Sequence, residues 1–177
     1  MLSRASLLTA ALLFCAISLP AQNQPGQQNQ PEAILHSADT SALLPPSVFF
    51  RGQTAPLQLR NSGGIRFADH TYTFVALVDS SGYASSLRDK YQAYLLTEVP
   101  LDFEGHHLPP GAYGCGFPTP DSFVVMDIGG NDLFSAHASS DPALRRPNPL
   151  QVQHADDATH YRLYSGRTYV TFSRASK

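Results

Sequence analysis

Tryptophan is absent from this 177-residue sequence, and cysteine and methionine occur only twice each. Cys15 falls inside an apolar N-terminal run, so Cys115 is the only cysteine in the rest of the chain. Once that run is removed, an internal disulfide is excluded. A Cys-x-x-Cys pair is also missing, which excludes a dithiol redox centre. The fold must therefore depend on its packed core.

Charge is scarce as well. Asp, Glu, Lys and Arg make up 15% of the residues, below the usual quarter, which argues against a long solvated helical bundle. The net charge of −2 gives no basic footprint for nucleic acid and no polybasic patch for a membrane surface. The sequence also lacks a Gly-x-Ser-x-Gly elbow, a His-Glu-x-x-His motif and a repeat of fixed period. The sequence therefore argues against a helical bundle, a nucleic-acid-binding protein, a protein with a polybasic membrane patch and a repeat protein.

The N-terminus has the layout of a secretory leader. Arg4 supplies a positive start, residues 7–17 are apolar except for Thr9, and Ser-Leu-Pro-Ala at residues 18–21 puts a small residue before Gln22. The apolar run is too short for a comfortable membrane span, although an uncleaved anchor is the alternative. We expect a signal peptide over residues 1–21, export to the periplasm or the exterior, and no membrane span after cleavage.

The next segment, residues 22–46, begins with a Gln-, Asn- and Pro-rich stretch that has nothing to bury. That composition predicts a disordered linker, with a short helix near residues 32–44 that Pro45 and Pro46 would end. We expect a single β-rich domain over residues 47–177.

Period-two patterning dominates that domain. Residues 57–67 alternate around an Asn-Ser-Gly-Gly sequence, which predicts a hairpin. Residues 71–78 and 123–128 are apolar runs typical of buried strands, and residues 85–90 suit one helical turn. Eight to ten short strands without long helices predict an all-β fold, either an antiparallel β-sandwich or a closed β-barrel, with one or two short helical turns.

One short motif agrees with the sandwich. Residues 108–113, Leu-Pro-Pro-Gly-Ala-Tyr, carry a stiff turn that feeds an aromatic strand residue. This segment resembles the Pro-Gly-x-Tyr turn of prealbumin-like and carboxypeptidase-regulatory-like β-sandwich domains. The resemblance covers about six residues, implies a sandwich, and carries over no active-site residue.

The last strands offer a candidate binding face. A two-residue turn at Ser165 and Gly166 would pair Arg162 with Tyr169 and Tyr164 with Arg167. Side chains alternate across a strand, so these residues would share the solvent face, with Tyr161, Leu163 and Val170 in the core. Tyrosine and arginine on a rigid sheet can anchor a sugar, an acidic ligand or a protein, or simply fix the register. The predicted binding residues are Arg162, Tyr164, Arg167 and Tyr169.

A second candidate is a metal site. Asp102, Glu104 and His106, followed by His107, have the spacing of side chains on one strand face, and their types suit a divalent cation. The alternative is a solvated rim beside a turn, because Gly105 can end the strand.

Three further residues could take part in chemistry. Cys115 lies between Gly114 and Gly116, a pattern of crowded packing that predicts a buried, unreactive thiol, the alternative being a reactive one. His154 and His160 flank a polar loop and could join a Ser/His/Asp site assembled from distant strands.

Together these patterns favour a non-enzymatic binding or structural module of the cell envelope. No cofactor is implied, and an envelope protein or a glycan is the expected kind of partner. The first alternative is an envelope hydrolase, metal-assisted through Asp102, Glu104 and His106. The second is a lipocalin-like barrel that carries a small apolar ligand.

Overall fold

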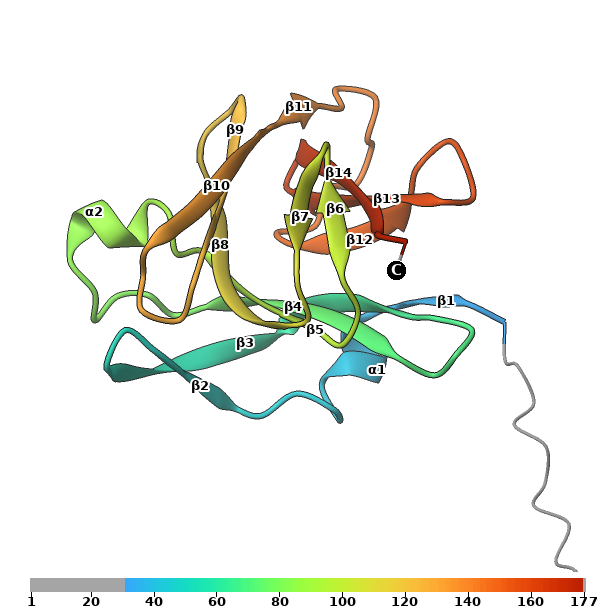
Figure 1. The fold of residues 1–177 in the computed structure, drawn as a ribbon. Coiled ribbons are helices and arrows are strands. Elements are labelled where there is room, and N and C mark those ends of the chain that lie inside the picture. Colours follow the sequence, from blue (N-terminus) through green and yellow to red (C-terminus); the bar gives the residue numbers. More distant parts are fainter. Residues whose placement is uncertain (1–30, 177) are drawn as a thin grey trace, which may run out of the picture.

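The computed structural model describes residues 31–176, which form fourteen strands and two short helices (Figure 1). Strands account for 53% of the structure and helix for 5%. Neighbouring strands of the larger sheet are antiparallel and follow the order β1-β3-β4-β5-β8-β9-β10, with β2 added on β3. Its members are β1 (Ala33–Leu35), β2 (Ser47–Phe50), β3 (Gln53–Arg66), β4 (Tyr72–Val78), β5 (Ala93–Thr97), β8 (Gly111–Thr119), β9 (Ser122–Met126) and β10 (Asp132–His137).

The smaller sheet packs against the larger one and follows the order β12-β13-β14-β6-β7, with β11 added on β14. The two sheets form a sandwich and do not close into a barrel, so the sandwich prediction is confirmed and the barrel alternative is wrong. The members of the smaller sheet are β6 (Leu101–Phe103), β7 (His106–Leu108), β11 (Ser139–Ser140), β12 (Gln151–His154), β13 (His160–Ser165) and β14 (Thr168–Arg174).

The main core lies between the sheets. Side chains alternate along each strand, so the residues facing inward from both sheets meet in one apolar layer. Phe103 stacks on Phe123 and Phe172 at ring-centroid distances of 5.5 and 5.2 Å. The chain changes sheets at Pro100, between β5 and β6, so this proline marks the crossing and lies outside both strands.

The larger sheet is also apolar on its outer face. On β4, Val75 faces the main core while Phe74 and Ala76 belong to a second cluster on the opposite side. Helix α2 (Ser85–Arg88) and β2 bring residues to that outer cluster, and Leu44 joins it from the segment that follows helix α1 (Ser37–Thr40). Two covered faces explain why residues 71–78 read as a continuous apolar run, and the predicted central strand is confirmed.

Aromatic rings hold the outer layer in place. Phe50 of β2 lies on Tyr91 with ring centroids 3.7 Å apart, and both side chains are fully buried. The Tyr83 hydroxyl donates a hydrogen bond to the Phe50 carbonyl oxygen at 2.9 Å. The helical turn predicted at residues 85–90 is present as α2, and it contributes the buried Leu87.

The hairpin predicted at residues 57–67 is wrong. Residues 53–66 form one continuous strand, β3, and the Asn-Ser-Gly-Gly sequence lies within it. Opposite β4 the register jumps between Gln58 and Ser62, because the intervening residues bulge out of the ladder. The Ser62 hydroxyl contacts the Leu59 carbonyl oxygen at 2.5 Å and the Thr40 hydroxyl at 2.6 Å. These contacts hold the bulge, so the apparent turn sequence serves a bend inside a strand.

The fold begins before the boundary expected at residue 47. Residues 33–35 pair with β3 as β1, so this part of the predicted linker is a strand of the larger sheet. The Tyr161 hydroxyl donates a hydrogen bond to the Glu32 carboxylate. The predicted short helix is present as α1, reduced to four residues. The predicted leader, Cys15 and residues 22–30 lie outside the described residues. Over residues 31–176, no helix has the length and apolarity to cross a membrane.

The two adjacent glycines of β3 give a matched test of packing. A Cβ atom on Gly64 would stand 2.3 Å from the Thr73 carbonyl oxygen, whereas one on Gly63 would have its nearest neighbour at 3.4 Å. We expect Gly64→Ala to lower the free energy of unfolding by about 1–3 kcal/mol, because backbone must move to admit the methyl group. Gly63→Ala is the control and should change it by less than about 1 kcal/mol. Urea denaturation measures both, and equal losses would contradict the packing described.

The buried thiol gives a pH-dependent prediction. Burial raises the pKa of Cys115 from 9.0 to about 12, so the folded chain keeps this proton at a pH where the unfolded chain loses it. Stability contributed by the protonated thiol is complete below pH 9 and falls as pH rises from 9 towards 12, by up to about 1.4 kcal/mol per pH unit. Urea denaturation between pH 8 and 10.5 should show a steeper decline for the parent protein than for Cys115→Ala. Equal slopes would contradict a thiol held neutral by burial.

Candidate functional site

The outer face of the smaller sheet is the sheet face that neither apolar cluster covers in the described part of the chain. Both faces of the larger sheet and the inner face of the smaller one are covered by apolar clusters. Over residues 31–176, no helix or further sheet is stacked on the remaining face (Figure 1). Its outward residues are polar or aromatic and come from four adjacent strands: Asp102, Gln151, Gln153, Arg162, Tyr164, Tyr169, Thr171 and Ser173.

The register of the β13–β14 hairpin differs from the prediction. Tyr164 lies opposite Tyr169 and Arg162 opposite Thr171, so the turn falls on Gly166 and Arg167. Gly166 has a φ of +61°, a conformation that glycine adopts without steric cost. The shift is two residues, which preserves the alternation. Tyr161, Leu163 and Val170 are therefore buried in the core as predicted, and Phe172 is buried with them.

Three of the four predicted binding residues form one cluster. The Arg162 guanidinium carbon lies 4.8 Å from the centre of the Tyr169 ring, and the Tyr164 and Tyr169 ring centroids are 5.1 Å apart. Arg162 also pairs with Asp156 at 2.6 Å, where the arginine side chain is 22% exposed and the aspartate 89%. We call Arg162, Tyr164 and Tyr169 the Arg–Tyr cluster.

Tyr164 is more deeply buried than the sequence suggested. Its residue exposure is 1%, and its hydroxyl lies 3.3 Å from an Asp141 carboxylate oxygen. Burial raises the pKa of Tyr164, so its phenol stays protonated and remains a hydrogen-bond donor. The tyrosine therefore fixes the cluster from below while Tyr169 and Arg162 reach the surface.

Arg167 does not join the cluster. It occupies the exposed hairpin turn, and its carbonyl oxygen accepts a hydrogen bond from the Asp141 backbone N–H at 2.9 Å. The register shift explains this position, because the predicted pairing placed it opposite Tyr164 and the observed pairing places Tyr169 there.

Two buried donors beside the cluster have no hydrogen-bond partner in the structure. They are Nε of Arg162 and Nε2 of Gln151, and Gln151 lies directly opposite Tyr164 on the neighbouring strand. Buried N–H groups nearly always find an acceptor, whether from the protein, water or a ligand. This face therefore holds two donors that the folded chain leaves without an acceptor.

The predicted metal residues do not converge. Asp102 lies opposite His107 and Phe103 opposite His106, so Asp102 and His106 point to opposite faces of the β6–β7 hairpin. His106 stacks on Phe134 with ring centroids 4.9 Å apart. Asp102 accepts a hydrogen bond from the Gly105 N–H at 2.8 Å, and Glu104 occupies the turn with a φ of +53°. No group of three or more metal-ligating side chains occurs among the described residues.

The other candidate residues for chemistry are separated too. His160 Nδ1 lies 2.9 Å from Asp157 within a surface loop, and His154 packs against the Tyr161 ring at 5.4 Å. The hydrogen bond from the His160 side chain makes the largest contribution to lowering the pKa of Asp157. The Asp157 carboxylate also accepts hydrogen bonds from the Thr159 and His160 N–H groups, so this pair stabilises the loop.

Cys115 is fully buried in the main core, which confirms the expected burial of the thiol. A Cβ atom on Gly114 would stand 2.6 Å from the Phe50 ring, and one on Gly116 would stand 2.4 Å from the Lys90 carbonyl oxygen. Both glycines therefore serve close packing. The apolar hollow beside Cys115 and Phe123 measures about 10 Å³, no larger than one water needs. A carrier barrel needs a closed sheet, and the two sheets of residues 31–176 do not close.

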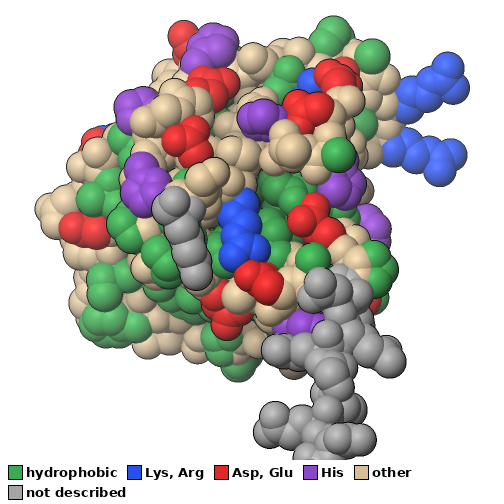
Figure 2. Space-filling model, turned by 45° about the vertical axis from the view of Figure 1, so that its right-hand side comes forward, with side chains coloured by type: hydrophobic (Ala, Val, Ile, Leu, Met, Phe, Trp, Pro, Cys, Tyr) green, Lys and Arg blue, Asp and Glu red, His purple; other side chains and the backbone are tan. Residues whose placement is uncertain are grey.

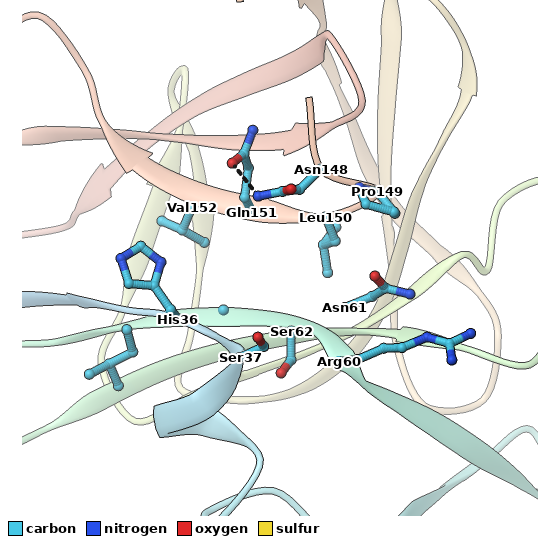
Figure 3. A pocket seen from close by; sticks show the side chains of 12 residues that line it. His36, Ser37, Arg60, Asn61, Ser62, Asn148, Pro149, Leu150, Gln151 and Val152 are labelled. Carbon is cyan, nitrogen blue, oxygen red and sulfur yellow. Dashed lines mark hydrogen bonds between the residues drawn. The ribbon is translucent and has the colours of Figure 1, made fainter. Parts of the chain in front are cut away.

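A pocket that the sequence did not predict lies at one seam of the sandwich. It measures about 170 Å³ and is bounded below by β3 and the start of α1 and above by β12 (Figure 3). We call it the seam pocket, and its lining includes His36, Ser37, Asn61, Asn148, Leu150 and Val152. The bulge in β3 opens it, and a turn-like sequence inside a strand was the only sign of that bulge.

Charge does not select strongly among ligands at this end of the molecule. Figure 2 shows acidic, basic and histidine side chains interspersed among neutral ones, without a broad area of one sign. Short ion pairs explain part of this balance, such as Arg174 with Asp69 at 2.6 Å. The hydrogen bond from the Arg174 side chain makes the largest contribution to lowering the pKa of Asp69.

Three comparisons were made with known proteins. Family models, curated proteins and solved structures all give no match to this chain.

Proposed function

We propose that this chain is a non-enzymatic binding module of the cell envelope that holds a neutral glycan on the outer face of its smaller sheet. The observation that carries the proposal is the pair of unused buried donors beside the Arg–Tyr cluster. Export rests on the leader-like residues 1–21.

The chemistry of the face favours a neutral, hydroxyl-rich ligand. Gln151, Gln153 and Thr171 offer uncharged hydrogen-bonding groups, and Tyr169 offers an aromatic ring. The Arg162 charge is already balanced by Asp156 at 2.6 Å, so an acidic ligand would have to displace that carboxylate. A neutral glycan carries no charge and does not compete with Asp156 for this arginine.

The shape of the face supports the same assignment. The outward residues follow four adjacent strands across one sheet, and this arrangement suits a chain-like molecule laid along the surface. The cluster is also rigid, because Tyr164 is buried and the ring contacts hold Arg162 and Tyr169 in place. Preorganised side chains lose little entropy on binding.

Two arginines provide a matched test. We expect the parent protein to co-sediment with at least one of three insoluble glycans, namely chitin, cellulose or purified peptidoglycan. Arg162→Ala combined with Tyr169→Ala should weaken that binding about tenfold or more, because both side chains reach the surface of the cluster. Arg167→Ala removes the same charge from the exposed turn and should bind like the parent.

Thermal denaturation would first establish that all three proteins are folded. Failure of the parent protein to sediment with any of the three glycans would overturn the proposal. Unchanged binding by the double variant would also overturn it, because the glycan would then lie elsewhere.

A further inference from the structure

We infer that the side of β10 turned away from β9 is an interaction surface, on which a second copy of this chain pairs strand to strand and extends the larger sheet. β10 is the last strand on one side of that sheet, and β9 is its paired neighbour (Figure 1). Over residues 31–176, no backbone hydrogen bond reaches the other side of β10. A row of unused N–H and C=O groups is a template for a further strand.

The hydrogen-bond pattern identifies the unused groups. The Ala138 N–H donates to the Asp121 carbonyl oxygen at 2.9 Å, and this bonded pair continues the β9–β10 register by one step. Bonded and non-bonded pairs alternate along antiparallel strands. The backbone of Ala136 therefore bonds to β9, whereas the N–H and C=O groups of Ser135 and His137 point away from it.

The other edge strands of the two sheets are shorter. β1 and β7 have three residues, β2 and β12 have four, and β11 has two, whereas β10 has six. Prolines also precede two of these strands, Pro45 and Pro46 before β2, and Pro147 and Pro149 before β12. Short strands and prolines are common means of preventing edge-to-edge pairing. β10 has neither, so it is the edge best suited to a partner strand.

Charge does not guard this edge either. Residues 134–140 read Phe-Ser-Ala-His-Ala-Ser-Ser, without lysine, arginine, aspartate or glutamate. The carboxylate of the strand, Asp132, pairs with Lys90 at 2.5 Å and precedes the bulge in the β9–β10 ladder. Leu133, at that bulge, is 48% exposed. A second strand would therefore meet no carboxylate, ammonium or guanidinium group of β10 along residues 134–140.

The edge is complementary to itself, which favours a second copy as the partner. If two copies of β10 pair antiparallel about a twofold axis at Ala136, Ser135 of each copy lies opposite His137 of the other. The outward N–H and C=O groups of both residues are then all paired. An axis at Ser135 would oppose His137 to the bulge, and one at His137 would oppose Ser135 to Ser139, which already pairs with β14. Such a twofold contact closes at two copies.

Sedimentation equilibrium and hydrogen exchange test the parent protein. We expect a monomer–dimer equilibrium with a dissociation constant of about 10–100 μM, the weak association that a small contact gives. As the dimer forms, hydrogen exchange should slow at the Ser135 and His137 amides, while the Ala136 amide, already bonded to β9, stays protected at every concentration. A monomer at about 500 μM, well above that dissociation constant, would overturn the inference. A dimer in which the Ser135 and His137 amides exchange as in the monomer would overturn it as well.

Two substitutions at one position provide a matched pair. Ser135→Pro removes an N–H that points away from β9, so the hydrogen bonds between β9 and β10 are kept. It should weaken dimerisation about tenfold or more, whereas Ser135→Ala keeps the N–H and should dimerise like the parent. Equal dimerisation by folded Ser135→Pro and the parent would overturn the inference, and the hydrogen-exchange result decides if this variant does not fold. None of these measurements uses a glycan, so the inference and the proposed function fail separately.

Discussion

The need to cover the outer face of the larger sheet shapes most of this molecule. An antiparallel sheet can leave one face in water, but here β4 and β9 are apolar on both faces. The segments around β2 and α2 cover this face with aromatic side chains rather than long helices. The Phe50 ring stacks on the Tyr91 ring with centroids 3.7 Å apart. Without this layer, Phe74 and Met126 would face solvent, at a cost of about 1.5–3 kcal/mol for each large side chain.

Close approach of backbone and rings is the second constraint. Gly64 lets β3 come within reach of Thr73, and Gly114 lets the Phe50 ring lie on β8. A side chain would push apart two strands of one sheet at Gly64, and it would separate a ring from its strand at Gly114. The same close packing surrounds Cys115 with apolar groups, so it behaves as a small core residue and its thiol stays protonated.

The sequence predicted the class of fold because alternation and turn residues are local signals. Runs such as 71–78 were identified correctly, since burial on both faces leaves an unbroken apolar stretch. The bulge of β3 was mistaken for a turn, because glycine and asparagine serve both and only pairing with β4 distinguishes them. The predicted register of β13 and β14 was wrong by two residues, and a shift of two leaves every side chain on its predicted face of the sheet. Arg162, Tyr164 and Tyr169 were therefore identified correctly, whereas Arg167 was misplaced. The seam pocket was invisible because its walls, at residues 36–37, 60–63 and 148–152, meet only in the folded chain.

Strand β12 is only four residues long, yet its two sides belong to different surfaces. Leu150, just before it, and Val152 form the ceiling of the seam pocket, while Gln151 and Gln153 look out beside the Arg–Tyr cluster. Asn148 links the two, since its side chain holds Gln151 and its carbonyl oxygen accepts from the Gly166 N–H. Because both sets of side chains belong to one strand, a shift of β12 moves both of them. A ligand that displaces β12 at one surface would therefore change the binding affinity at the other. Thermodynamic linkage requires the coupling free energy to be the same in both directions.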